Sequence, residues 1–448
     1  MDQSQAPYAE ALSVVAAADR LPLHVPGHKR GRRAPALAGL LFGDALGHDL
    51  TELPGLSDLS SPDGPLARAQ RLAAAAYGVA DTHFLTGGST AGVLAMLLAA
   101  GNGRPVIAPR TAHRSVVAGM VLAGAYPVFL PVEISGGLAR PPAAAAYLDA
   151  MDRFPTAIPC VTHPTYHGLG TELGCIVRAA HARGIPVLVD EAHGAHFPFH
   201  PGLPQSGVAA GADLVAHSAH KTLGALTGGA WLHRQGNLVS AEALRAAVAL
   251  LQSTSPSHLI LASLDLARRE AVCEGRQRLD ELLAALAEAR GALARAGWHC
   301  PVAADPTKLF LATGAGPDVG RELTAKGIYL ELADTSGCLA VLTLADDCGT
   351  VESLTGTLLG LDAPGVPPRP SPWDELLLSV DNQALWPRAA TFAAQELVSL
   401  ESAGGRVAAE IVAPCPPGLC VTVPGARLDA AAIACLRAAG RQSVRVIA

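Results

Sequence analysis

A carboxylate and a lysine that follow two apolar segments are the residues of this sequence best suited to chemistry. Asp190 ends the apolar run 187–189, and Lys221 follows a histidine in the polar segment 218–222. Pyridoxal 5'-phosphate (PLP) needs a lysine that holds its aldehyde as a Schiff base and an Asp that keeps its ring nitrogen protonated. The pair therefore indicates a PLP enzyme that acts at the α-carbon of an amino acid. Either residue alone is better explained as a strand-end carboxylate or a solvated loop lysine.

A glycine- and hydroxyl-rich segment at 86–92 precedes an apolar helix and could hold a phosphate group. Its glycines allow close backbone approach, its hydroxyls donate hydrogen bonds, and a helix N-terminus attracts an anion. The same segment is also an ordinary helix cap. It matches neither the Walker loop nor the GxGxxG fingerprint, so nucleotide binding is the poorer interpretation.

Histidines near these segments admit two interpretations. His113 could stack on a flat ring or move a proton, but the chain holds sixteen histidines, and a surface-loop position explains this one equally well. Asp190, Glu191, His193 and His196 could together hold a divalent metal. The metal site ranks second, because PLP explains the polar segment at 218–222 and a metal does not.

Composition bounds the class of protein. The 448 residues predict two or three domains, and 50% apolar but only 4% aromatic residues predict a core of Ala, Val and Leu. A net charge of −6 without a basic run argues against nucleic acid as the main partner. The nine cysteines form no CxxC pair and no secretory signal is seen, which predicts a reduced, cytoplasmic protein. The apolar stretches are too short to span a bilayer.

Alternating helices and short apolar strands from about residue 65 predict a parallel sheet covered on both faces. The expected strands are 105–108, 127–130, 157–161, 186–189, 214–217 and 229–233. Ligands of such sheets bind at the carboxyl ends of the strands, where Asp190 and Lys221 are expected.

Four regions follow from the pattern along the chain. Residues 1–40 are expected to form an N-terminal helix and arm, and 41–260 the large domain. A long helix at 259–296, broken near Gly275, opens a small α/β domain at 261–363. Five prolines within 364–372 predict a linker, and a last domain is expected at 373–448.

Several ordered motifs now support a family resemblance. The chain resembles the bacterial PLP-dependent Orn/Lys/Arg decarboxylases of the aspartate-aminotransferase fold, in the short form that lacks an N-terminal wing domain. The matching segments are 22–29, 48–56, 88–92, 189–197, 220–223, 251–257, 262–265, 416–418 and 424–425. The resemblance implies an α/β protein of PLP fold type I, whose large domain has a mostly parallel seven-stranded sheet with helices on both faces, followed by smaller α/β domains.

The resemblance also assigns roles. It implies that Lys221, His113 and Asp190 are catalytic, as Schiff-base lysine, ring-stacking histidine and partner of the pyridinium nitrogen, and that His193 lies near the phenolic oxygen. It further implies a homodimer with shared active sites, an amino-acid substrate, and no metal. The implied cofactor-binding residues are Gly88, Ser89, Thr90, His113, Asp190, Ala192, His193, Ser218, His220, Lys221, Thr254 and Ser255.

The implied reaction is decarboxylation of arginine, lysine or ornithine to the amine and CO2, through an external aldimine and a quinonoid. Four positions depart from the family pattern: His163, the segment 381–384, Cys415, and Ala426, where the family carries Glu. A carboxylate at the last position would suit a distal ammonium or guanidinium group. The sequence does not choose among these amino acids.

Two alternatives remain open. The departures would also suit another PLP reaction at Cα, such as oxidative deamination, elimination or cyclisation in a specialised pathway. The third interpretation is a catalytically silent homologue. It is disfavoured because Lys221, Asp190 and His113 are all kept.

Overall fold

A seven-stranded sheet forms the centre of the computed structural model, which describes residues 1–18, 20–59, 62–380, 382–414 and 418–448. The strand order is β1-β9-β8-β7-β6-β2-β3. The strands are β1 (Asp81–Leu85), β2 (Pro105–Pro109), β3 (Tyr126–Leu130), β6 (Ile158–Thr162), β7 (Leu188–Asp190), β8 (Leu214–His217) and β9 (Ala230–Arg234). The pairs from β8 to β3 are parallel, whereas β9 is antiparallel to both of its neighbours. The predicted mostly parallel α/β sheet is confirmed.

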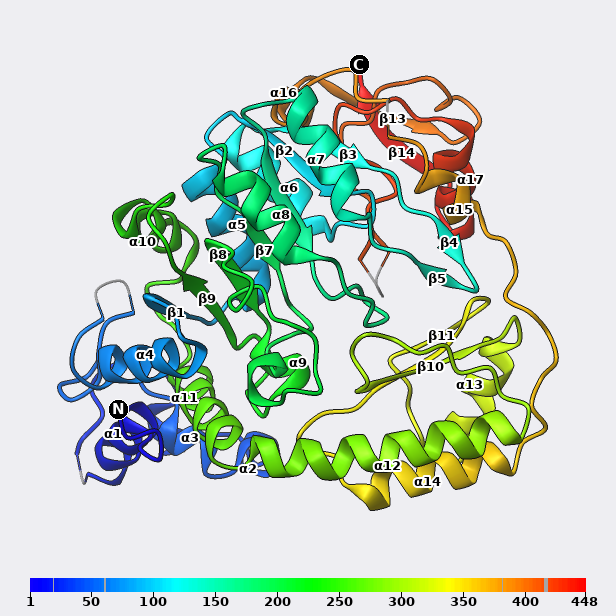
Figure 1. Cartoon of the computed structure of the whole chain (residues 1–448). Helices are drawn as coiled ribbons and strands as arrows, with labels where there is room; N and C mark the ends of the chain where they lie inside the picture. The colour runs from blue at the N-terminus through cyan, green and yellow to red at the C-terminus, as the bar shows by residue number, and fades with distance from the viewer. Residues whose placement is uncertain (19, 60–61, 381, 415–417) are drawn as a thin grey trace.

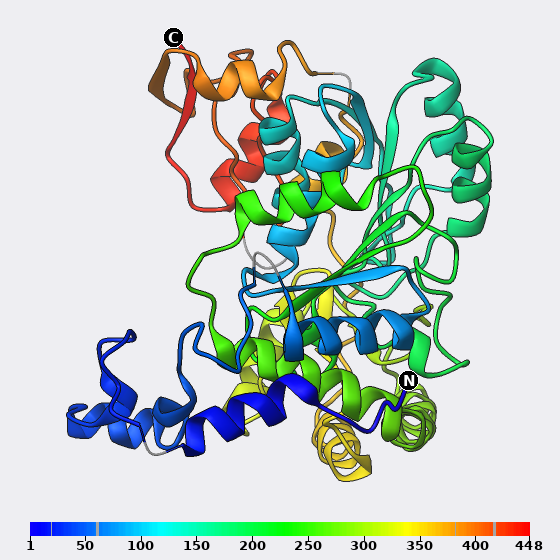
Figure 2. The ribbon, with the colours of Figure 1, turned by 90° about the vertical axis from the view of Figure 1, so that its left-hand side faces the viewer.

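Helices cover both faces of this sheet, as Figure 2 shows with the sheet between two groups of helices. On one side lie α7 (Ala144–Arg153) and α8 (Leu173–His181), and on the other α5 (Gly88–Ala100), α6 (Arg114–Ala123) and α10 (Ala241–Leu251). The helix α4 (Gly64–Tyr77) packs on β1. Since both faces are buried, the central strands are continuous runs of apolar residues, and these runs made them recognisable in the sequence.

The second unit begins with two helices, α11 (His258–Cys273) and α12 (Gly275–Arg295). The non-helical Glu274 (φ −125°) separates them, which confirms the predicted break. A three-stranded antiparallel sheet follows, in the order β10 (Lys308–Ala312), β12 (Gly337–Val341), β11 (Leu332–Asp334). The helices α13 (Gly316–Ala325) and α14 (Cys348–Leu359) complete the unit, and its core is separate from that of the large sheet.

Residues 362–371 form neither helix nor strand, in agreement with the predicted linker, and cross the molecule to the C-terminal module (Figure 1). The module contains α15 (Pro372–Leu376), α16 (Pro387–Phe392), β13 (Gln395–Ser399), α17 (Ala430–Ala438) and β14 (Ser443–Ile447). It has its own apolar core. It docks on the large domain through Arg110, whose guanidinium group donates to the carbonyls of Cys420 (2.7 Å) and Val421 (3.2 Å).

The N-terminal helix α1 (Pro7–Ala17) is anchored on α11 by buried polar contacts. The hydroxyl of Tyr8 lies 2.6 Å from Nδ1 of His258, and the Tyr8 backbone N–H donates to Asp265. The arm continues through η1 (Lys29–Gly31), α2 (Ala36–Phe42) and α3 (Ala45–His48). Short elements elsewhere are β4 (Ile134–Ser135), β5 (Leu138–Ala139), η2 (Phe197–Phe199) and α9 (Ala219–Thr222). In the described parts of the chain, no helix combines the length and apolar character that a bilayer crossing needs.

Candidate active site

Four chain segments meet at the carboxyl edge of the central sheet. His113 follows β2, Asp190 ends β7, Lys221 lies on α9 directly after β8, and α5 begins after β1. Parallel strands place their carboxyl ends at one edge, so residues far apart in sequence come together there. The structure thus brings together most of the residues that the sequence predicted, as the following contacts show.

Lys221 is half-buried and points to the loop that follows β7. Its Nζ lies 3.2 Å from Nε2 of His193. Neighbouring residues fix the short helix α9 in place: His220 Nδ1 contacts the carbonyl of Gly229 (3.0 Å), and the Ser218 hydroxyl donates to that of Ser89 (3.0 Å). The segment 218–222 is therefore tied to β9 and to the start of α5, which limits the motion of the lysine stem.

Asp190 is buried at the end of β7, with an exposed fraction of 5%. Its Oδ1 accepts from the backbone N–H of Ala192 (3.3 Å). The half-buried Ala192 carries only a methyl group, so the face beside Asp190 is free of bulky side chains. A buried carboxylate in such a position can stabilise a cation by charge pairing.

His113 caps the N-terminus of α6. Its Nδ1 accepts from the Ser115 backbone N–H (3.2 Å) and lies 2.8 Å from the Ser115 hydroxyl. Burial lowers the pKa of His113, as do the positive charges of Lys221 and Arg114, while the Asp190 carboxylate acts in the opposite direction. His113, Asp190 and Lys221 therefore lie within electrostatic range of one another, although they come from three different strands.

The N-terminus of α5 has the character of an anion site. Gly87 occupies the cap position, so no side chain satisfies the first N–H groups of this thirteen-residue helix. Gly88 adopts a left-handed conformation (φ +71°), and Ser89 and Thr90 follow it. The Gly88 N–H donates to the Gly228 carbonyl (2.8 Å), and the following N–H groups and the helix dipole favour a phosphate. Together with Lys221 and Asp190, this cradle fits PLP.

Thr254 and Ser255 lie apart from this cluster, in the exposed loop between α10 and α11. Thr254 lines a cavity of about 330 Å³ together with His83 and Arg245. Within the described chain, neither residue contacts Lys221. The start of this loop is tied to the segment 86–92 through Gln252, whose Oε1 accepts from the Thr86 backbone N–H (3.2 Å).

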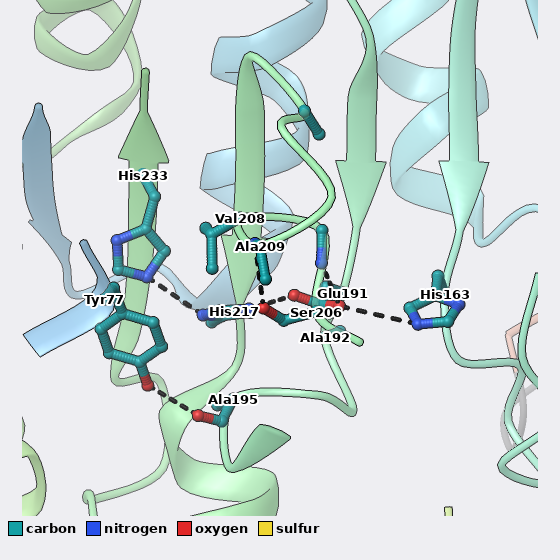
Figure 3. Close-up of polar contacts among 12 residues, drawn as sticks. Tyr77, His163, Glu191, Ala192, Ala195, Ser206, Val208, Ala209, His217 and His233 are labelled. Atoms are coloured by element: carbon teal, nitrogen blue, oxygen red, sulfur yellow. Dashed lines mark hydrogen bonds and ion pairs between the residues drawn. The ribbon is translucent and has the colours of Figure 1, made fainter. Parts of the chain in front are cut away.

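A buried polar network surrounds Glu191, the residue after Asp190 (Figure 3). Its Oε2 lies 2.6 Å from Nε2 of His217, and Nδ1 of His217 lies 3.0 Å from Nε2 of His233. The Thr82 hydroxyl lies 2.8 Å from Nδ1 of His233 and ends this chain of contacts. Burial, foremost, and the charges of His217 and His83 hold the pKa of His233 well below its usual range. Glu191 thus braces β1, β7, β8 and β9.

The metal-site alternative finds no supporting geometry. Glu191 pairs with His217, and His193 is placed between two lysines. Over the described ranges, no group of three or more His, Cys, Asp or Glu residues is arranged to hold a metal ion.

The departures from the family pattern have structural explanations at two positions. His163 is buried: its Nδ1 accepts from the Thr171 backbone N–H (3.1 Å), and its Nε2 faces the Gln205 carbonyl (3.0 Å). Ala426 belongs to an apolar cluster with Val117, so a carboxylate at that position would need a buried partner. Asp381 and the run 415–417 lie outside the described residues.

Sequence reasoning missed Lys308, which the structure places beside the predicted site. Its side chain is buried at the start of β10, and its Nζ lies 3.1 Å from Nδ1 of His193. Burial lowers the pKa of Lys308 to about 8; Asp305 and Glu331 act in the opposite direction, and Lys221 adds to the lowering. The available signal was a lysine that opens an otherwise apolar strand, which is uncommon without a partner.

Comparison with known proteins assigns the family. The family model for the Orn/Lys/Arg decarboxylase major domain matches residues 6–309, and that for the C-terminal domain matches residues 379–443. The chain belongs to the Orn/Lys/Arg decarboxylase family. The predicted resemblance is confirmed.

Relatives span nearly the whole chain. An arginine decarboxylase of Bacillus subtilis is 34% identical over 450 residues, covering 95% of this chain and 91% of the relative. An arginine decarboxylase of Halalkalibacterium halodurans is 33% identical, covering 99% of this chain and 95% of the relative. The crystal structure of the Francisella novicida lysine decarboxylase has a TM-score of 0.86 at 17% identity, covering 99% of this chain and 81% of that one. This likeness confirms the predicted PLP fold type I.

Proposed function

We propose that the protein is a PLP-dependent decarboxylase that releases CO2 from a basic amino acid: arginine, lysine or ornithine. The carrying observation is that His113, Asp190 and Lys221 converge at the carboxyl edge of the sheet, at the ends of β2, β7 and β8, in a chain of this family. Each of the three residue types has a distinct task in PLP chemistry.

The cofactor would be held from several sides. Lys221 would bind its aldehyde, Asp190 would keep its ring nitrogen protonated, and His113 would stack on the ring while Ala192 lines the other face. The uncapped start of α5 supports a phosphate site there. The proposed phosphate and near-cofactor residues are Gly88, Ser89, Thr90, Ser218 and His220, with His193 toward the phenolic oxygen.

When bound, PLP supplies an electron sink for the pair of electrons left at Cα after the bond to the carboxylate breaks. The tasks of the chain are then to orient that bond, exclude water and return a proton to Cα. Lys221 and His113 are the candidate proton donors. Burial lowers the pKa of His113, and because its Nδ1 accepts from the Ser115 backbone N–H, the neutral ring carries its proton on Nε2.

Arginine is the substrate we place first. Two relatives named arginine decarboxylase match more than nine-tenths of the chain at about a third identity. Because Ala426 is packed in an apolar cluster, another carboxylate must recognise the guanidinium group. Asp49, Glu52 and Asp58 are the candidates that we propose.

We further propose a homodimer in which the loop at Thr254 and Ser255 completes the partner's cofactor site. The exposure of this loop supports this arrangement. Four large apolar side chains of α2 are also exposed and would be covered by a second copy: Leu37, Leu40, Leu41 and Phe42.

The proposed domain boundaries are those of the four regions; separate apolar cores support a small α/β domain and a C-terminal domain, whereas α1 and α11 pack in the core of the large sheet. A cytoplasmic location is proposed as well, because all eight described cysteines are free, and reducing compartments favour free thiols.

The test is a visible spectrum of the purified protein with PLP, followed by a CO2-release screen over arginine, lysine and ornithine. We expect a visible band that borohydride removes, its loss in Lys221→Ala, and CO2 from one substrate. Ammonia and peroxide in place of CO2 would contradict decarboxylation while keeping the cofactor. A colourless protein, or a band that survives Lys221→Ala, would overturn the proposal.

A further inference from the structure

Lys308 is a lysine buried without a carboxylate partner. Its exposed fraction is 1%, and no acidic oxygen of the described residues lies within ion-pair distance of its Nζ. In the nearby Asp305 carboxylate, Oδ1 accepts from the backbone N–H and the hydroxyl of Thr307 and lies 3.4 Å from His196 Nε2, whereas Oδ2 is buried and has no hydrogen-bond partner among the described residues. Burying an ammonium group is costly. A buried lysine that the fold does not pair with an acid is a candidate for a functional role.

The loop after β6 passes close to the aliphatic part of the Lys308 side chain. A Cβ on Gly168 would come within 2.8 Å of Lys308 Cγ, so only glycine allows the loop after β6 to pass there. Tyr166 from the same loop contacts the His193 ring edge-on (5.3 Å) and donates to Glu331. Lys308 is therefore held between loops of the large domain and its own strand β10, directly behind His193.

His193 joins the two lysines through its two ring nitrogens. Nδ1 faces Lys308 (3.1 Å) and Nε2 faces Lys221 (3.2 Å). Burial holds the pKa of His193 well below its usual range, and the charges of Lys308 and Lys221 lower it further. The ring is consequently neutral and carries one proton, so one nitrogen donates and the other accepts.

An ammonium group donates only, so the contact with Lys308 makes Nδ1 the acceptor and leaves the proton on Nε2. That N–H lies on the side of Lys221, whose nitrogen is no longer an ammonium group once it is bonded to the aldehyde of PLP. The same N–H is the donor available to the phenolic oxygen of PLP.

We propose that Lys308 is a positioning residue of the active site: its ammonium group fixes His193 as the Nε2–H tautomer and thereby keeps an N–H donor directed at the phenolic oxygen of the cofactor. This inference rests on the proposed function. The charged and titratable groups that face Lys308 are Asp305 beside it, Glu331 before β11, Lys221 on α9, and His167 and His193 in the loops after β6 and β7.

The test uses the affinity of the apoprotein for PLP and the pH dependence of the visible band. Lys308→Met keeps the length of the stem and removes the charge. We expect at least about a tenfold weaker affinity, the lower range for a lost hydrogen bond from a charged donor. We also expect the band to titrate at higher pH, since a positive charge near the lysine–cofactor bond is gone.

Three further variants make the result specific. Lys308→Arg should recover most of the affinity. In a His193→Phe background, Lys308→Met should change the affinity by less than about twofold, because residues that act through one partner are not additive. Lys326→Met removes an exposed lysine of the same unit and should match the parent.

The outcomes separate this inference from the proposed function. A parent band with an unchanged Lys308→Met variant, or an equal loss with and without His193, overturns the role of Lys308 alone. A parent protein that shows no PLP band overturns the proposed function and this inference together.

Discussion

Lys308 has a consequence for stability as well as for chemistry. Its pKa is about 8 in the folded chain and near the ordinary lysine value of 10.5 in the unfolded one. Below about pH 8 both states bind the proton, and the buried charge costs its full amount. Between the two values the unfolded chain binds more protons, so the contribution of Lys308 to stability becomes more favourable as pH rises.

We therefore predict that Lys308→Met stabilises the apoprotein most at neutral pH and that its advantage shrinks toward pH 10. The pH-dependent part is at most about 3 kcal/mol, from the size of the pKa change. Urea unfolding of both proteins at about pH 7 and about pH 10 measures it, and other titrations cancel in the difference. A difference that is equal at both pH values would contradict the buried, perturbed lysine. Lys326→Met should stay within about 0.5 kcal/mol throughout.

The elements position the site through contacts between regions distant in sequence. Gly418 of the C-terminal module lies against the His113 ring: a Cβ there would approach His113 Cδ2 to 2.8 Å, and the Gly418 carbonyl accepts from the Arg114 N–H (3.1 Å). The start of α6 is thus held from outside the large domain. Within the large domain, the Glu191–His217–His233 chain of contacts holds together β7, which ends in Asp190, and β8, which precedes Lys221.

Gly418→Ala should displace the His113 ring and weaken PLP binding by about tenfold or more, because ring stacking depends on its placement. Gly405→Ala is the matched control: its φ of +76° resembles the +78° of Gly418, but a Cβ there meets nothing within 4 Å. Both variants bear similar backbone strain, so the contact with the His113 ring is the difference between them. Equal PLP affinities in the two variants would show that the contact with His113 has no role.

Much of this arrangement could be predicted at the level of elements. The six apolar strands were found because a doubly covered sheet leaves continuous apolar runs. The strand β1 was missed, since its sequence begins with the polar run Asp81-Thr82-His83 and its place depends on pairing with β9. Lys308 was missed for a similar reason: its contact with His193 joins residues separated by 115 positions, and no local pattern encodes it.

At the scale of the whole molecule, a second subunit is the expected source of Thr254 and Ser255. We predict complementation between two inactive proteins, Lys221→Ala and the double variant Thr254→Asp, Ser255→Asp, whose added charges repel a phosphate. A mixed dimer contains one intact site, formed by the loop-variant subunit's Lys221 and the other subunit's loop. Decarboxylase activity of the mixture, after exchange of subunits, measures it.

The control mixes Lys221→Ala with Asp190→Ala. Both defects lie in the same half of the site, so a mixed dimer holds no intact site and should stay inactive. Recovery in neither mixture would contradict the shared site and leave the loop with a role inside its own subunit.

The docking of the C-terminal module through Arg110 also bears on how this enzyme can be re-engineered. The peptide bonds at Cys420 and Val421 are held by the guanidinium group, and the nearby Gly418 backs the histidine of the candidate site. A chimera that exchanges this module for that of a relative would therefore also exchange the backbone that contacts His113. Exchanging the module should therefore change the activity of the enzyme. A chain that ends at the proline-rich linker would keep Lys221 but lose the backbone that supports His113.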